Sequence, residues 1–422
     1  MSVSRRFSFE RAFFDRTLTP GQPLPFWVPL LLGCLTAVGP VSTDIYLPAL
    51  PEMEHQLGAA AGSGSLTMAA WVAGLAIGQM SVGPLTDRFG RRAPLLVGTL
   101  CYAIAAAGCA LAPTMTVMCV FRFIAALMGA ASLVVPNACV RDLTYGDASA
   151  KMMSRLIIVQ GVVPILAPAL GGFALQFIGW RDIFWATSLY GLLGFVLVAL
   201  FLPETLLPIR RQPVQMKAVL VRYGKTLCEP HFCLNGLIWM VQGFVTFTYL
   251  TAAPFLFESV FHLSPFHYGM LFGLFAVFMI GTSQLNALLV DRFSSEGILK
   301  TALIWSTLAA LAFVVLAVWS AVESAPLGHL NAMYLWPMIV IMLLVLGPGG
   351  AIGPNAMAGA LRYQAHNAGS AAALAGTGQY VMGMVASVLF SLLPVGTAIP
   401  MAVMLLTAFL VMLVLAYYPR KG

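Results

Sequence analysis

The sequence predicts an all-α, polytopic membrane protein whose twelve transmembrane helices form two six-helix bundles. Of its 422 residues, 60% are hydrophobic and only 9% are charged, whereas a soluble domain carries about 25% charged residues. Such a chain cannot bury its apolar side chains in a water-facing globule, so lipid must be its main solvent. The low charge excludes a disordered chain, and the long apolar runs exclude a transmembrane β-barrel of short alternating strands.

The twelve predicted spans are apolar runs of about 20 residues, the length that crosses the hydrocarbon core. The first six are Phe26–Leu47, Ser65–Leu85, Pro94–Ala112, Met115–Cys139, Met153–Ile178 and Ile183–Leu202. The second six are Phe232–Phe257, Phe266–Val290, Ile298–Ala321, Met333–Leu361, Ser370–Leu393 and Ile399–Tyr418.

The polar connection between Pro203 and Pro230 separates two halves that repeat one another. Asp-Arg-Phe follows the second span at 87–89 and the eighth span at 291–293, and Pro-Asn-Ala recurs at 136–138 and 354–356. Each match pairs a span with the one six later, which predicts a duplicated unit with a substrate site between the halves near the midplane. The predicted divisions are an N-terminal tail at 1–25, a bundle at 26–202, a linker at 203–231, a second bundle at 232–418 and a tail at 419–422.

The placement of Lys and Arg predicts the orientation in the membrane. Arg181 is the only basic residue predicted in an outer loop and Arg122 the only one deep inside a span; the other 20, including Arg155 and Lys300 at the inner ends of their spans, lie on the side of the N-terminus. Both termini are therefore expected to face the cytoplasm, and the net charge of +7 reflects this bias rather than nucleic-acid binding. Phenylalanines among the arginines of residues 1–25 favour a short helix on the inner membrane surface.

The sequence offers no catalytic or metal-binding motif. Gly224-Lys225-Thr226 resembles the end of a phosphate-binding loop, but Val219 stands where the first glycine belongs. Cys228 and Cys233 flank His231 at a spacing that fits no familiar zinc site. HExxH and GxSxG motifs are also absent, so we expect neither an enzyme nor a cofactor.

Two ionisable residues stand out deep inside the predicted spans, where a charge is costly and indicates a function by default. Asp44 lies in the first span and Arg122 in the fourth. Because these spans run in opposite directions, both residues lie in the outer half of the bilayer and can pair directly or through water. One interpretation is an ion pair that only locks two helices. The other is that Asp44 takes up and releases a proton, because burial disfavours a charged carboxylate while a nearby guanidinium favours it.

Several motifs resemble those of one transporter family. Residues 83–92, GPLTDRFGRR, fit the loop signature of the major facilitator superfamily over its whole length, and residues 161–172 resemble the fifth-helix motif of its drug antiporters. With STDIYLPALP at 42–51 and Arg-Asp at 141–142, the chain resembles the Bcr/CflA branch, named for bicyclomycin and chloramphenicol resistance. The resemblance implies a drug:proton antiporter of the bacterial inner membrane, driven by the proton gradient without a cofactor.

The loop signature is expected to act as a cytoplasmic latch. Its glycines permit close helix approach and a tight turn, and Asp87 can accept hydrogen bonds from a helix N-terminus. The resemblance implies that this helix is the eleventh, in the other half. The predicted latch residues are Gly83, Asp87, Arg88, Gly90, Arg91, Arg92, Arg141 and Asp142. Ordinary loop charges of a cytoplasmic face are the alternative, and residues 291–293 lack the Gly-Arg-Arg that would complete a second latch.

The fifth span is expected to be a bent helix with a smooth face. Pro164 and Pro168 each remove a helix hydrogen bond, and Gly161, Gly171 and Gly172 remove side chains. The resemblance implies that this face presses against the other half and seals the outer side. A helix bent for packing alone is the alternative.

Polar groups at membrane depth need partners, and aromatic rings provide walls for lipophilic molecules. The candidates for a substrate cavity are Tyr46, Asn137, Gln160, Asn235, Trp239, Gln242, Asn355, Gln379 and Tyr380. For any one of them, packing in the bundle or against lipid is the alternative.

These observations and the resemblance together predict a proton-driven exporter of lipophilic small molecules that works by alternating access. We expect a monomer whose partners are its cargo, protons and membrane lipid, with no nucleic acid. Thr36 stands where some relatives that export cations carry a second acid, which favours neutral or weakly charged cargo. A transporter of a specific metabolite, such as a nucleoside, sugar or amino-acid derivative, and a membrane sensor that transports nothing are the alternatives.

Overall fold

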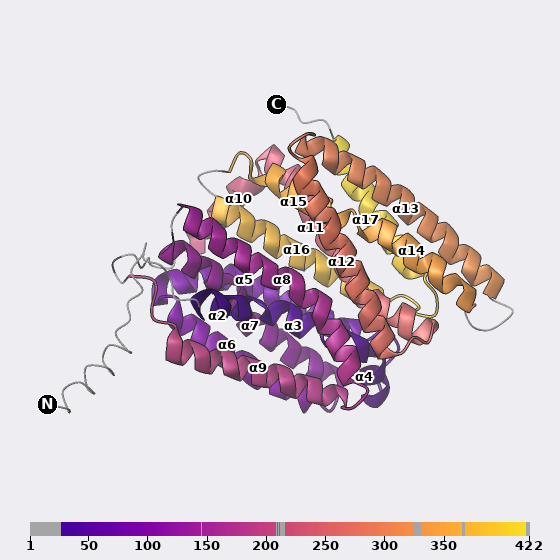
Figure 1. The fold of residues 1–422 in the computed structure, drawn as a ribbon, viewed down its shortest axis with the longest axis horizontal. Coiled ribbons are helices and arrows are strands. Elements are labelled where there is room, and N and C mark those ends of the chain that lie inside the picture. Colours follow the sequence, from indigo (N-terminus) through magenta and orange to yellow (C-terminus); the bar gives the residue numbers. More distant parts are fainter. Residues whose placement is uncertain are drawn as a thin grey trace.

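The computed structural model describes residues 27–144, 146–207, 209, 211, 216–324, 331–364 and 368–418 (Figure 1). Over these residues the chain consists of helices and connecting loops and has no β-strand, which confirms the all-α prediction. Residues 1–25, including the helix expected there, and residues 419–422 lie outside the described ranges.

The first half begins with a crossing built from four consecutive helical pieces. These are α2 (Trp27–Thr36), α3 (Val38–Asp44), η1 (Leu47–Ala49) and α4 (Leu50–Gln56). The following crossings are α5 (Ser65–Phe89), α6 (Arg92–Ala110), α7 (Met115–Leu143), α8 (Gly146–Ala174) and α9 (Trp180–Phe201).

The second half begins with α11, which continues into a π-helical turn. Its helices are α11 (Pro230–Pro254), η3 (Phe255–Val260), α12 (Pro265–Leu289), α13 (Ser295–Ser324), η5 (Ala332–Tyr334), α14 (Leu335–Leu346), α15 (Gly349–Leu361), α16 (Ala368–Ser391) and α17 (Ile399–Tyr417). Between the halves, part of the expected linker forms a further helix, α10 (Met216–Leu227).

The helices match the predicted spans in number and order. In the described chain, eleven helical segments are long and apolar enough to cross a membrane, and α8 adds a shorter apolar stretch, Ile158–Ala174. The first crossing continues to Gln56, beyond its predicted end at Leu47. The reason is that Pro48 and Pro51 lie in the first turns of η1 and α4, where a missing N–H breaks no helix bond.

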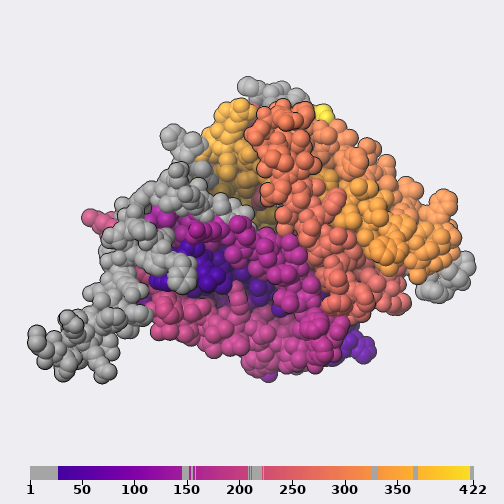
Figure 2. Space-filling view, in the orientation of Figure 1, coloured from indigo at the N-terminus to yellow at the C-terminus, as the bar shows by residue number. Residues whose placement is uncertain are grey.

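Two pairs of helices join the halves. α5 packs along α16, and α8 packs along α12. Figure 1 shows α8 and α12 side by side, and in Figure 2 the magenta surface of α8 meets the orange surface of α12. The other extensive helix contacts, such as α5 with α7 and α11 with α16, lie within one half. The two halves therefore meet along two seams.

Glycines let the backbones at the α8–α12 seam approach closely. A Cβ placed on Gly172 would lie 2.2 Å from the carbonyl oxygen of Pro265 in the other half, and one on Gly171 would lie 1.9 Å from that of Ile45. Gly161 makes no comparable approach, since the nearest atom to its Cβ would be 3.8 Å away. The smooth face expected of the fifth span thus lies at the C-terminal end of α8.

This packing predicts opposite effects for one added methyl group at two glycines. Gly172→Ala should destabilise the protein by about 1–3 kcal/mol, because the methyl group would overlap the Pro265 backbone. Gly281→Ala in α12 is the matched control: a Cβ there meets nothing within 4 Å, and alanine favours a helix by about 0.5–1 kcal/mol. Thermal unfolding in mild detergent measures both. Equal midpoints of thermal unfolding for Gly172→Ala and Gly281→Ala would contradict the close approach of the backbones at Gly172.

Candidate functional site

A cavity of about 290 Å³ lies between the two halves. We call it the central cavity. Its lining is mainly apolar and aromatic, from Trp71 and Leu75 in the first half to Phe247 and Phe272 in the second. The residues that bring a hydroxyl, amide or carboxyl group to this lining are Thr43, Asp44, Gln242, Thr246, Tyr249 and Tyr380.

Asp44 reaches this cavity from the last residue of α3. Its side chain is only 5% exposed, and the neighbouring Thr43 side chain interacts with the carboxyl group. Across the cavity lie Gln242 and Tyr249 of α11 and the rings of α12. A carboxyl group is therefore held at the junction of both halves, among side chains suited to a lipophilic ligand.

Arg122 of α7 is buried beside the same helix but outside the central cavity. Its Nη1 donates a hydrogen bond to the carbonyl oxygen of Ser42 at 3.0 Å. Its guanidinium carbon lies 4.3 Å from the ring centre of Trp71 and 4.4 Å from that of Tyr46, with Phe184 farther off at 5.9 Å. These aromatic faces attract the cation.

The direct ion pair considered between Asp44 and Arg122 is absent from this conformation: within the described residues no such pair lies within 4.0 Å. Arg122 instead binds the backbone of Ser42, and the ring of Trp71 both contacts Arg122 and lines the central cavity. Arg122 therefore positions the last turn of α3 and adds positive charge behind an aromatic wall.

A second cavity, of about 560 Å³, lies towards the end of the molecule that carries Asp87 and Arg141, which we call the basic end. Asn137 and Gln160 line it, as does Gly369 in the first turn of α16. It shares three lining residues with the central cavity, namely Leu75, Leu133 and Tyr380. These three side chains stand between the two spaces.

The other predicted cavity residues line neither of these two spaces in this conformation, because each is engaged elsewhere. Tyr46 bonds Thr67 at 3.0 Å and packs on Arg122. Asn235 donates to the carbonyl oxygen of His231. Asn355 bonds Asn286 and Ser295 inside the second half, Trp239 packs near Gly353, and Gln379 packs near Gly243.

At the basic end, Arg91 organises the loop between α5 and α6. It donates to Asp87 at 2.6 Å, to Asp142 at 2.9 Å and to the Thr86 hydroxyl at 2.9 Å. Burial alone lowers the pKa of the Arg91 guanidinium, but its bonds to Asp142 and Asp87 outweigh this and raise the pKa above the ordinary value. Gly90 supports the turn with a φ of 89°, a conformation that glycine adopts freely.

Among the described residues, the side chain bonded to Asp87 is that of Arg91, while residues 365–367, just before the helix N-terminus expected to bind Asp87, lie outside the described ranges. Asp87 bonds Arg91, although it lines the basic-end cavity together with Gly369 and Ser370 of α16. The carboxylate that caps the start of α6 is Glu204, which the sequence reasoning missed. It accepts bonds from the backbone N–H of Arg91 at 2.8 Å and of Arg92 at 3.3 Å, at the start of α6.

The remaining latch and fifth-helix residues have local roles. Arg92 donates to the carbonyl oxygen of Ala199 at 2.6 Å, and the Arg88 guanidinium lies 5.1 Å from the ring centre of Phe89. Gly83 has open space around it. Pro164 lines the central cavity. The carbonyl oxygen of Pro168 packs closely against the backbone of Gly269 in α12.

Two further acids in the helical crossings escaped the sequence reasoning. Glu54 of α4 is buried and accepts bonds from the backbone of Gly62 at 3.1 Å and Gly64 at 2.5 Å. Glu258 lies in η3, one residue beyond the predicted end of its span. Both lie at the end opposite to the basic end, which we call the far end. Their positions next to span boundaries made them look like loop residues.

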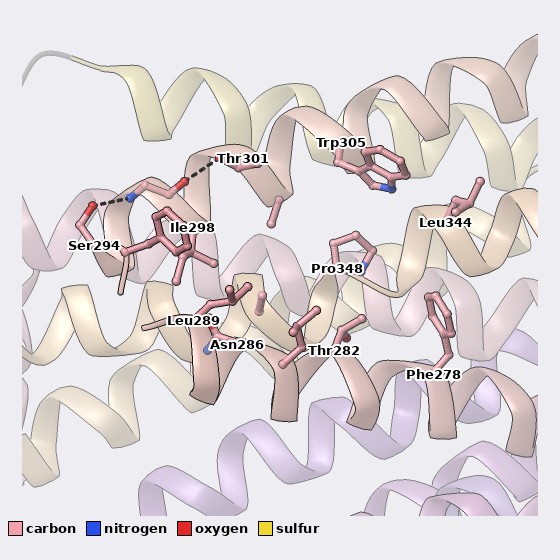
Figure 3. Close-up of a pocket in the computed structure, with 15 residues that line it drawn as sticks. Phe278, Thr282, Asn286, Leu289, Ser294, Ile298, Thr301, Trp305, Leu344 and Pro348 are labelled. Atoms are coloured by element: carbon pink, nitrogen blue, oxygen red, sulfur yellow. Dashed lines mark hydrogen bonds between the residues drawn. The ribbon is translucent and has the colours of Figure 1, made fainter. Parts of the chain in front are cut away.

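A third cavity, of about 620 Å³, lies entirely in the second half. Figure 3 shows Phe278, Thr282 and Asn286 of α12 facing Trp305 of α13 across it, with Pro348 beside them. Because its described lining comes from one half, a relative movement of the halves would not open or close it. Among the described residues, no group of three or more His, Cys, Asp or Glu side chains is placed to hold a metal ion.

Comparison with known proteins agrees with this architecture. Residues 32–387 match the family described as Major Facilitator Superfamily. The chain is 33% identical to the uncharacterized MFS-type transporter YdgK of Bacillus subtilis, over 90% of this chain and 92% of that protein. It is 30% identical to the bicyclomycin resistance protein homolog of Haemophilus influenzae, over 92% and 94%. A D-xylose–proton symporter shares the fold, with a TM-score of 0.71, 16% identity and coverage of 92% and 97%.

The bonds of Glu204 predict a large contribution to stability. Glu204→Ala should destabilise the protein by about 2–3 kcal/mol, because it leaves the N–H groups of Arg91 and Arg92 without their charged acceptor. Glu296→Ala, which removes an exposed pairing with Lys300 four residues along the same helix, should cost less, about 0.5 kcal/mol. Thermal unfolding in detergent compares the two. A loss of stability in Glu204→Ala that is no larger than the loss in Glu296→Ala would refute the capping role of Glu204.

Proposed function

Because the chain belongs to the major facilitator superfamily, in its Bcr/CflA branch, and is therefore an integral membrane transporter rather than an enzyme, we propose that it exports lipophilic small molecules in exchange for protons. The observation that carries this proposal is the central cavity, where Asp44 shares one space with aromatic and apolar side chains of both halves. The name of the Haemophilus influenzae relative, a bicyclomycin resistance protein homolog, favours antibiotic-like cargo.

The proposed orientation places the basic end in the cytoplasm. Arg88, Arg91 and Arg141 lie there, and basic residues stay on the cytoplasmic side during membrane insertion. The larger basic-end cavity then adjoins the cytoplasm and the inner leaflet. Cargo would enter through it and pass Leu75, Leu133 and Tyr380 to reach the central cavity.

Alternating access follows from the two seams between the halves. With the α8–α12 seam closed, a deprotonated Asp44 meets cargo that arrives from the basic end. Rocking of the halves opens this seam and closes the basic end, where the network around Arg91 meets the first turn of α16. A proton from the far side then neutralises Asp44 and cargo leaves. Each charge moved across 100 mV supplies about 2.3 kcal/mol.

In this proposal, Arg122 influences the protonation of Asp44 without pairing with it directly. Its bond to the Ser42 carbonyl holds the turn that carries Asp44, and its charge favours the ionised carboxyl group from behind Trp71. A shift of α3 against α7 would change both influences together. The protonation of Asp44 is thereby tied to the arrangement of the helices.

The central test is Asp44→Asn. The amide cannot carry a proton, so we expect folded protein that still binds cargo but loses at least about tenfold of its gradient-driven export. Everted membrane vesicles are energised, exposed to bicyclomycin, chloramphenicol, a nucleoside or xylose, and followed with a pH-sensitive dye. Glu52→Gln, a carboxyl-to-amide change at an exposed site, is the control.

Each outcome of this assay is informative. Proton release with bicyclomycin or chloramphenicol that Asp44→Asn abolishes supports the proposal. A response only to the nucleoside or the sugar indicates a metabolite transporter, and no response to any compound favours a sensor. Undiminished gradient-driven export by Asp44→Asn would refute the role of Asp44.

The latch makes a separate prediction. Asp87→Asn should slow turnover about 3–30-fold while changing cargo affinity less than twofold, because Asp87 contacts Arg91 rather than the central cavity. Asp291→Asn, at the matching position of the second half, should have a smaller effect on turnover. Transport rate and equilibrium binding are measured on the same reconstituted protein. A large affinity loss with normal turnover would contradict the latch.

A further inference from the structure

Three buried polar atoms lie together between the central cavity and the far end. Within the described chain, the hydroxyl oxygens of Tyr249 and Tyr268 and the Oε1 atom of Glu258 have no hydrogen-bond partner. A buried polar group without a partner costs about 1–3 kcal/mol, so each such group in a native protein calls for an explanation. Packing does not supply one, since phenylalanine fills the same space as tyrosine without this cost.

The two tyrosines belong to one continuous aromatic cluster. Tyr249 of α11 lines the central cavity together with Asp44. Its ring stacks on Phe272 at 5.3 Å, and Phe272 also contacts the ring of Tyr268 at 6.4 Å. On its other side Tyr268 stacks on Phe257 at 6.4 Å. The cluster therefore leads from the cavity wall towards η3.

Glu258 follows directly after Phe257 and ends this series. It lies in the π-helical turn η3, a rare geometry that is frequent at functional sites. Glu258 is partly exposed, whereas Tyr268 is fully buried, and the next residue, Ser259, is exposed. Glu258 can therefore exchange protons with water at the far end.

Electrostatic interactions connect the same groups. Tyr268 lies near enough to Tyr249, Glu258 and Asp44 for a charge on one of these groups to act on it, and Tyr249 lies near enough to Asp44. Asp44 and Glu258 thus both influence one buried hydroxyl group, although they lie on different halves of the molecule.

We propose that Glu258, Tyr268 and Tyr249 form a relay that carries protons between the far-end surface and Asp44. This inference rests on the proposed proton coupling at Asp44 and adds the route by which the proton arrives. Since these groups do not bond one another directly, a proton from outside water binds the Glu258 carboxylate and passes through water to the Tyr268 hydroxyl, whose own proton moves on through water to Tyr249. Tyr249 in turn releases its proton to Asp44, so both tyrosines end unchanged and one proton has moved.

The other titratable groups around η3 are engaged or exposed. η3 packs against α4, α11 and α12, and the groups beside it on α4 and α12 are Glu52, Glu54, His55 and His267. Glu54 is held by two backbone N–H groups, Glu52 accepts a bond from Gln56, and His267 bonds Ser264. His55 is exposed. Of these acids and histidines, Glu258 has a buried carboxyl oxygen, Oε1, that forms no hydrogen bond with any described residue.

The test separates proton delivery from cargo movement. Full-length protein in proteoliposomes is assayed with bicyclomycin for transport driven by a pH gradient, and for counterflow, in which bicyclomycin exchanges with bicyclomycin and no net proton moves. Glu258→Gln and Tyr268→Phe should each slow gradient-driven transport about tenfold or more and leave counterflow within about twofold. Glu258→Asp, which keeps a carboxyl group, should restore most of the rate, and Glu52→Gln should change neither assay.

Two results would overturn the relay. One is gradient-driven transport at the wild-type rate in Glu258→Gln and Tyr268→Phe. The other is an equal loss in both assays, since that indicates a general effect on folding or on the movement of the halves. Failure of the proposed function is seen separately: wild-type protein then shows no gradient-driven transport of bicyclomycin, or Asp44→Asn retains it.

Discussion

The burial of one carboxyl group between two lipid-embedded halves is the constraint on which the rest of the structure depends. Asp44 is 5% exposed and lies where helices of both halves meet. A charged carboxylate is costly in such a place unless it is paired, and a neutral carboxyl group is much less so. The carboxyl group is therefore sensitive to whatever else occupies the cavity, which is the property that the proposed exchange of a proton for cargo requires.

The position of Arg122 keeps that sensitivity. A direct ion pair would hold Asp44 in its charged form, whereas Arg122 is bound to the Ser42 carbonyl and enclosed by the rings of Trp71 and Tyr46. The Arg122 cation is held by one hydrogen bond and by aromatic faces, so the Asp44 carboxylate stays free of a direct ion pair with it. Its influence passes through the turn of α3 and the aromatic wall, both of which shift when the helices move.

The two seams between the halves use different chemistry. At α8–α12 the backbones approach through Gly172 and Gly269, and such a contact depends on shape alone. At the basic end, Arg91 and Glu204 tie the α5–α6 loop to neighbouring elements of the first half. This charged assembly lies within the first half and faces the start of α16 across a cavity; the proposed cycle, in which one seam opens while the other closes, would therefore leave its bonds intact.

The sequence alone determined the twelve crossings, the duplicated halves, the buried acid at Asp44 and the glycine-rich face of the fifth span, because lipid imposes length and composition on each segment locally. Only the tertiary structure decided that Arg122 binds Ser42, that Glu204 caps the start of α6, and that Gln242 and Tyr380 reach the central cavity while Asn235 and Gln379 do not. The linker helix α10 also emerged only there. The reason is physical: in helices that are apolar on every side, periodicity does not mark which face meets which neighbour, so the partner of a polar side chain is set by helices distant in sequence.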